Sequence, residues 1–215
     1  MNREEKNRQT QGKILASATA EFAEHGYEAA SLNTVCLTGG VSKGIIYHYF
    51  ISKDGLYLAC LKECFRSLTE YLKEHISEET EQEDLLTGYF NARLEFFRKH
   101  EDYARIFCGA VIFPPIRLQK EIADIRRDFD EMNDGYLRKL LRDSRLRSDL
   151  SEEEIIRAFR MMQDSLNASY HHPSEAGLDI ARHENDCRNL VNIFLYGILE
   201  KRKKIVNHLS FPLLI

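Results

Sequence analysis

The stretch GGVSKGIIYHYF, residues 39–50, decides the fold expected of this chain. Its two glycines break a short preceding helix, because glycine takes the positive φ of a tight turn. Val41 is apolar and is expected to be buried. Ser42 is placed to cap a second short helix that begins at Lys43. Two short helices joined by a glycine turn within about twenty residues form a helix-turn-helix pattern.

The second short helix has two faces of different character. Ile46, Tyr49 and Phe50 share one face and are expected to pack inward. Tyr47 and His48 are then expected to point outward, where their polar tips can reach a phosphate or a base edge. In a helix-turn-helix, the N-terminal end of the second helix enters the major groove of DNA.

Other helices are predicted around this pattern. Apolar spacing predicts a first helix over 9–25, with Gly26 as a left-handed cap. Ser31 is a candidate N-cap for the short helix over 32–38. A longer helix is expected to begin at Lys53 and to carry an apolar stripe as far as Ile76.

The rest of the chain is predicted to be helical. The acidic stretch 78–84 is expected to be a loop at a domain boundary. Ser151 followed by Glu154 is a capping-box start. Few prolines and apolar residues three and four apart predict helices over 84–99, 102–113, 118–145, 151–171 and 180–204. The predicted fold class is therefore all-α, with a three-helix N-terminal head joined by a long helix to a larger C-terminal helical body.

Composition narrows the class of protein. The chain has 215 residues, is 43% hydrophobic and has a formal charge of −4. Six Lys and Arg balance six Asp and Glu in the first sixty residues, so DNA binding would depend on the placement of charge. No stretch reaches the roughly 20 apolar residues of a membrane span. Five cysteines without a framework spacing, and a polar N-terminus, predict a cytoplasmic protein with reduced thiols.

The segment EFAEHGYEAASLNTVCLTGGVSKGIIYHYFISKDGLYLACL, residues 21–61, resembles the DNA-binding head of TetR/AcrR-family transcriptional regulators. The resemblance implies an all-helical homodimer with this head on each subunit. It also implies domains over 1–52, for DNA binding, and 53–215, for ligand binding and dimerisation. It is carried by Phe22, Gly26-Tyr27, Gly40-Val41-Ser42-Lys43-Gly44, Tyr47-His48-Tyr49-Phe50, Ser52-Lys53 and Leu56.

The resemblance also implies DNA contacts. Gly39 departs from the family pattern, which often has alanine there, and should cost about 1 kcal/mol of helix propensity. Val35-Cys36 and Gly55 are further departures, and none of them removes a contact residue. Lys53 is the expected phosphate contact after the linker, and the others fall on Ser31, Ser42, Lys43, Gly44, Tyr47 and His48.

Bulky apolar residues in the body could line a pocket for a small, partly apolar effector. Plain core packing explains each of them as well. Arg93 with His100, or Gln163 with Asn167, could supply its polar groups. The predicted pocket residues are Phe90, Arg93, Phe107, Val111, Phe113, Phe159, Met162, Gln163 and Leu166.

The last long helix is apolar on more than one face. Two stripes indicate burial against the body and against a second subunit, and the resemblance implies pairing through the last two helices. The alternative is a central helix in a monomer. The predicted dimer residues are Leu190, Val191, Phe194, Leu195 and Ile198.

No cofactor, metal site or catalytic motif is predicted. Cys60 and Cys64 share an apolar face, which favours small buried hydrophobes over a thiol sensor. No carboxylate pair or thiolate cluster joins His171-His172 and His183. The role of the apolar tail 209–215 is left open.

The functional hypothesis is a sequence-specific DNA-binding regulator, a repressor whose operator binding is released by an effector in the body. An effector-dependent activator and a helical protein-interaction module without DNA binding are the alternatives. A small-molecule enzyme is disfavoured because no catalytic constellation is present.

Overall fold

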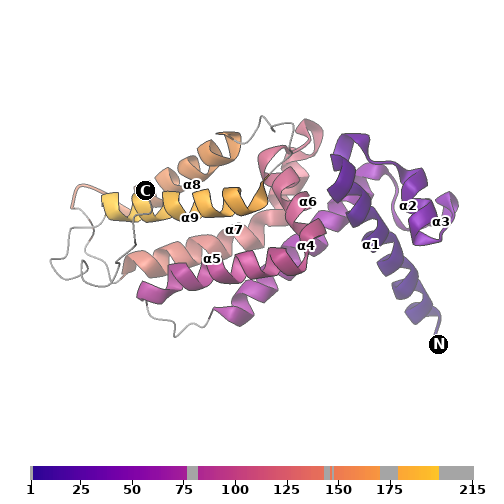
Figure 1. Cartoon of the computed structure of the whole chain (residues 1–215), viewed down its shortest axis with the longest axis horizontal. Helices are drawn as coiled ribbons and strands as arrows, with labels where there is room; N and C mark the ends of the chain where they lie inside the picture. The colour runs from indigo at the N-terminus through magenta and orange to yellow at the C-terminus, as the bar shows by residue number, and fades with distance from the viewer. Residues whose placement is uncertain (1, 77–81, 143–145, 147, 170–178, 199–215) are drawn as a thin grey trace, which may run out of the picture.

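The computed structural model describes residues 2–76, 82–142, 146, 148–169 and 179–198. All regular elements in these ranges are helices, which confirms the all-α prediction. Figure 1 shows a small head of α1–α3 at one end, a bundle of α5–α9 at the other, and α4 running between them. The elements are α1 (Arg3–Ala29), α2 (Leu32–Gly39), α3 (Lys43–Tyr49), α4 (Lys53–His75), α5 (Gln82–Lys99), α6 (Glu101–Ile112), η1 (Ile116–Leu118), α7 (Gln119–Arg142), α8 (Glu152–Ser169) and α9 (Ile180–Ile198).

Helix α1 starts earlier than its apolar stripe predicts. Asn2 and Glu5 form a capping box. The backbone N–H of Asn2 donates to Glu5 Oε2 at 3.0 Å, and the side-chain Oδ1 of Asn2 accepts from the backbone N–H of Glu4 at 3.2 Å. These polar caps start the helix before any apolar residue appears. Near its other end the backbone kinks at Gly26, which has the predicted left-handed φ of +70°, and the helix then continues to Ala29.

The turn between α2 and α3 uses its two glycines differently. Gly40 has a φ of +62° and ends α2 as its left-handed cap. Gly39 is still helical, and a Cβ built on it would lie 3.0 Å from Ser17 Oγ of α1. A glycine at position 39 therefore allows the close approach of α1 and α2, which its low helix propensity alone does not reveal.

Helix α4 connects the head to the body. Ser52 caps it, since its Oγ accepts a hydrogen bond from the Gly55 N–H at 3.1 Å. The predicted apolar stripe is buried along its length, and the Phe65 ring lies 5.2 Å from that of Phe107 and 5.7 Å from that of Phe129. One continuous helix thus shares its core with both parts of the molecule.

The body helices follow the predicted order with shifted ends. The capping box of α8 is confirmed: the Ser151 N–H donates to Glu154 Oε2 at 2.9 Å, and the Glu154 N–H donates to Ser151 Oγ at 3.2 Å. The loop predicted over 78–84 is wrong at its end, because α5 already begins at Gln82. Residues 77–81 and the predicted extension of α9 to 204 lie outside the described residues.

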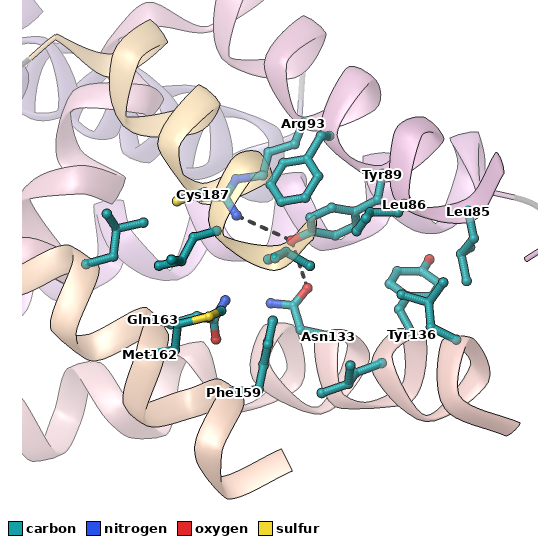
Figure 2. Close-up of a pocket in the computed structure, with 16 residues that line it drawn as sticks. Leu85, Leu86, Tyr89, Arg93, Asn133, Tyr136, Phe159, Met162, Gln163 and Cys187 are labelled. Atoms are coloured by element: carbon teal, nitrogen blue, oxygen red, sulfur yellow. Dashed lines mark hydrogen bonds between the residues drawn. The ribbon is translucent and has the colours of Figure 1, made fainter. Parts of the chain in front are cut away.

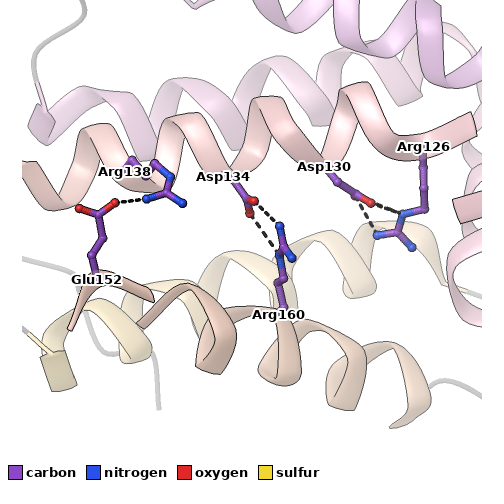
Figure 3. Close-up of polar contacts among 6 residues, drawn as sticks. All are labelled: Arg126, Asp130, Asp134, Arg138, Glu152 and Arg160. Carbon is purple, nitrogen blue, oxygen red and sulfur yellow. Dashed lines mark hydrogen bonds and ion pairs between the residues drawn. The ribbon is translucent and has the colours of Figure 1, made fainter. Parts of the chain in front are cut away.

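Ion pairs link the exposed sides of α7 and α8 (Figure 3). Arg138 pairs with Glu152, and Arg160 pairs with Asp134. Such exposed pairs contribute only about 0–1 kcal/mol each, so buried side chains hold the body together. In the part of the chain that is described, no helix is long and apolar enough to cross a bilayer.

Candidate nucleic-acid interface and ligand cavity

Helix α3 presents the two faces that its sequence predicts. Ile46 is 1% exposed and Phe50 is 7% exposed, and both belong to the core. Tyr47, by contrast, is 47% exposed, and His48 is exposed beside it. Tyr49 is only half-buried, and its hydroxyl donates to Asn7 Oδ1 of α1 at 3.1 Å. The first helix therefore supports α3 from its side as well as from the core.

Two serines predicted to touch DNA are helix caps. Ser42 Oγ accepts from the Ile45 N–H at 3.4 Å, and Ser31 Oγ accepts from the Asn33 N–H at 3.3 Å. A capping hydroxyl uses an oxygen lone pair and keeps its O–H as a donor. Each serine can therefore hold its helix start and still donate to a phosphate. Lys43 and Gly44 are exposed directly after Ser42, at the start of α3.

A buried carboxylate that the sequence did not reveal holds α2 in place. Glu21 of α1 is 6% exposed, and its Oε1 accepts a hydrogen bond from the Ser31 N–H at 2.7 Å. A negative charge at this position also suits the positive end of the α2 dipole. Glu21 thereby fixes the start of α2 relative to α1.

Lys53 lies where α1 ends and α4 begins. Its Nζ donates to the Glu28 carbonyl oxygen at 2.9 Å and lies 5.1 Å from the centre of the Tyr27 ring. The side chain is half-buried, and its ammonium has further N–H donors, so it can meet a phosphate while it ties the two helices together.

A polar junction next to Lys53 joins the head to the body. The Tyr27 hydroxyl donates to Asp54 Oδ1 at 2.5 Å. Arg117 of η1 reaches the same carboxylate at 3.0 Å and also donates to the Tyr27 hydroxyl. The hydrogen bond from Tyr27, together with Arg117, holds the pKa of Asp54 below its usual value. We call Tyr27, Asp54 and Arg117 the junction cluster.

A cavity of about 50 Å³ lies between α5, α7, α8 and α9 (Figure 2). Six of the nine predicted pocket residues line it: Phe90, Arg93, Phe159, Met162, Gln163 and Leu166. The lining also includes Leu190 and Val191, predicted for the dimer interface, and eight residues that were not predicted: Leu85, Leu86, Tyr89, Asn133, Tyr136, Leu137, Leu140 and Cys187.

The remaining predicted pocket residues lie elsewhere. Phe107 packs in the core against Phe129, with ring centres 5.6 Å apart. Val111 and Phe113 are half-buried against the core and do not line the cavity. His100 is exposed at the start of α6, outside the cavity. Asn167 does not line the cavity, and its Oδ1 lies 3.1 Å from His183 Nε2, from which it accepts when that nitrogen is protonated.

A chain of polar groups crosses the cavity. The Tyr89 hydroxyl donates to Asn133 Oδ1 at 2.8 Å and accepts from Arg93 Nη1 at 3.4 Å (Figure 2). Arg93 Nη2 also pairs with Glu184 Oε1 of α9 at 2.8 Å, and the two side chains are only 7% and 4% exposed. Burial opposes ionisation of Glu184, but Arg93 and His183 together hold the pKa of its carboxyl below its usual value.

The predicted dimer residues mostly face inward within the subunit. Leu190 and Val191 line the cavity, and the Phe194 ring lies 5.8 Å from that of Phe159. Leu195 is half-buried against the core, and the side chain of Ile198 lies outside the described residues. The strongly exposed apolar side chains of α8 and α9 are instead Met161, at 66%, and Ile193, at 67%.

Cys60, Cys64 and His183 are all buried side chains. Cys60 and Cys64 are fully buried, as the apolar stripe predicts. His183 is buried in the body, and His171-His172 lies outside the described residues.

Comparisons with known proteins agree with this geometry. Residues 14–60 match the family model of bacterial regulatory proteins of the tetR family. The activator FasR of Mycolicibacterium smegmatis is 29% identical over 48% of each chain. The repressor AcnR of Corynebacterium diphtheriae is 40% identical over 29% of this chain and 33% of its own. The chain thus matches half or less of the length of these two relatives.

Solved structures extend the likeness to the body. FadR of Bacillus subtilis, solved with stearoyl-CoA, has a TM-score of 0.66 at 18% identity, covering 86% of this chain and 98% of its own. FadR of Bacillus halodurans has a TM-score of 0.64 at 17% identity, covering 84% and 96%. At these identities the likeness shows the fold alone. Residues 14–60 thus match the tetR-family model, and the chain as a whole is similar in fold to the two FadR structures.

Proposed function

We propose that this protein is a homodimeric, sequence-specific DNA-binding regulator that acts in the cytoplasm as a repressor, and that an effector in the body cavity releases it from DNA. The main observation is the outward face of α3, where Lys43, Tyr47 and His48 are exposed while Ile46 is anchored in the core. A short helix held in this way can insert its N-terminal end into the major groove.

The proposed contacts divide by role. Ser31, Ser42 and Lys53 lie at helix starts, where backbone amides and the helix dipole favour phosphate. Lys43, Gly44, Tyr47 and His48 would meet the groove, and these contacts carry sequence information only where they reach base edges. Because charges balance in the first sixty residues, affinity would depend on these few groups and on the helix N-termini.

Pairing through α8 and α9 would set the distance between two heads. Exposed Met161 and Ile193 offer apolar surface on these helices. A two-fold dimer would place its recognition helices about 34–36 Å apart, so that they meet successive major grooves on one side of the duplex.

Release by an effector would use the connection along α4. The cavity of about 50 Å³ is far below the roughly 300–1,000 Å³ of a typical ligand site, so a ligand has to part its walls. Operator affinity falls if the ligand binds better to the parted conformation than to the DNA-competent one. The FadR structure of Bacillus subtilis, of similar fold, was solved in complex with stearoyl-CoA, a ligand with a long apolar acyl chain, which supports a ligand site in this body.

Selection of bound duplexes from random-sequence DNA tests the proposal. The expected result is a near-palindrome whose half-sites lie one helical turn apart. A folded dimer that retains no duplex at low salt would support the protein-interaction alternative instead, and retained duplexes without a shared sequence would refute sequence-specific binding. A reporter gene behind the selected site then separates repression, which lowers expression, from activation, which raises it.

A further inference from the structure

We propose that the body cavity takes an uncharged, mainly apolar molecule with one hydrogen-bonding group, such as an amide or a hydroxyl, which accepts from Arg93. This inference rests on the proposed function, since it treats the cavity as the effector site. It concerns the chemical class of the ligand, which the fold of the family does not determine.

The walls of the cavity select an apolar body. Leu85 and Leu137 are almost fully buried in the lining, and Phe159 and Leu166 come from the facing helix α8. Met162 lies in the same wall, and its flexible thioether side chain can change shape as a ligand enters.

One donor at the cavity has no partner. Arg93 Nε is buried and makes no hydrogen bond to any described residue, although both other nitrogens of the guanidinium are used. An unpaired buried N–H is costly, so an acceptor on a ligand gains more here than at a satisfied site. Asn133 adds a side-chain NH₂ group next to the Tyr89 hydroxyl, on the line of polar groups in Figure 2.

The charge of Arg93 is already neutralised. Its ion pair with Glu184, at 2.8 Å, leaves no net charge on these two side chains, and His183 Nδ1 lies 3.5 Å from the same Glu184 oxygen. A ligand carboxylate would bring a second anion next to Glu184 in a region of low dielectric, where like charges are costly. A neutral acceptor avoids this repulsion and still satisfies Nε.

A titration with two matched ligand series tests the inference. Straight-chain primary amides and carboxylates of equal carbon number, such as octanamide and octanoate, are titrated into the purified dimer at pH 8 by calorimetry. At this pH a free carboxylate is ionised. The amide is expected to bind at least about tenfold tighter than its carboxylate, which is a difference of about 1.4 kcal/mol in binding free energy. Equal or tighter binding of the carboxylate, or no binding in either series, would overturn the inference.

Two variants identify the group responsible. Glu184→Gln removes the carboxylate that neutralises Arg93, so the preference should reverse toward octanoate. Arg93→Met should lose most of the amide affinity, while Arg98→Met, at an exposed position of α5, should keep it. If Arg93→Met does not fold, the reversal in Glu184→Gln still decides the matter, and an unchanged preference in that variant contradicts the inference.

DNA binding of the ligand-free protein is measured on the same samples. A protein that binds its selected operator but prefers carboxylates refutes the ligand class and leaves the regulator function standing. A protein that prefers amides but binds no DNA refutes the regulator function instead.

Discussion

Arg93 and Glu184 lie 91 residues apart in the chain and form a buried ion pair that ties α5 to α9. Helix α5 packs on α4, which reaches the head, and α9 carries part of the proposed subunit interface. A change at this pair can therefore reach both ends of the proposed regulatory path.

Removal of one partner of this pair should destabilise the body strongly. Glu184→Ala leaves the Arg93 charge buried and unpaired, which costs about 3–5 kcal/mol. The double variant Arg93→Met, Glu184→Leu should recover much of that loss, because it buries no charge. Urea unfolding at a fixed protein concentration measures both effects. A loss below about 1 kcal/mol in Glu184→Ala would show that the pair is accessible to water.

The junction cluster should matter for DNA binding more than for stability. Arg117 is 62% exposed, so Arg117→Ala should change the free energy of unfolding by less than about 1 kcal/mol. Operator affinity should nevertheless fall several-fold, because Arg117 no longer holds Tyr27 and Asp54 at the start of α4. Arg127→Ala is the matched control, since Arg127 is 61% exposed and pairs within α7. Equal operator affinities of the two variants would remove the junction cluster from the coupling path.

Gly39→Ala should not raise the stability of the protein, although helix propensity favours alanine. Alanine gains about 1 kcal/mol over glycine in a helix interior, which is an upper limit for Gly39 at the last position of α2, and its Cβ would lie 3.0 Å from Ser17 Oγ. Gly39→Ala alone should therefore bring no gain in stability, whereas Gly39→Ala in a Ser17→Ala background should bring up to about 1 kcal/mol. Thermal unfolding of the four proteins gives this comparison. A full gain in Gly39→Ala alone would mean that α1 and α2 separate freely.

The cysteines should differ in their reactivity. Burial raises the pKa of the Cys60 and Cys108 thiols to about 12 and that of Cys187 to about 11. Burial also raises the pKa of Cys64. In the folded protein at pH 8 an aromatic disulfide reagent should therefore react quickly only with half-buried Cys36. Rapid labelling of Cys60 or Cys64, located by mass spectrometry, would revive the thiol-sensor reading.

Local signals in the sequence predicted the head well. The caps at Ser31 and Ser42 and the inward face of Ile46 and Phe50 depend on residues within one or two turns. The early start of α1 was missed because the Asn2–Glu5 capping box precedes the apolar stripe. The Asn2–Glu5 spacing is itself a local signal for this helix start.

Contacts between distant segments were not predictable in the same way. Nothing in the local pattern pairs Arg93 with Glu184 or Arg117 with Asp54, because each pair depends on how long helices pack. The same limit affected the pocket. Helical spacing identified apolar residues of α5 and α8, but the α7 wall with Asn133 and Tyr136 depends on which face of that helix turns inward.

The central claim is that a few placed residues on α3 and at the start of α4 bind DNA. Fluorescence anisotropy of the selected operator tests this claim with three proteins. They are the wild type, the double variant Tyr47→Ala, Lys53→Gln, and the control Lys62→Ala on the exposed side of α4. Glutamine at position 53 removes the charge but keeps side-chain N–H donors, so the change in salt slope reports the lost charge. The double variant should bind at least about tenfold more weakly, a loss of 1.4 kcal/mol, with a salt slope lower by about 0.9 for the lost phosphate contact. Binding by the double variant that equals wild type in affinity and in salt slope would contradict the account.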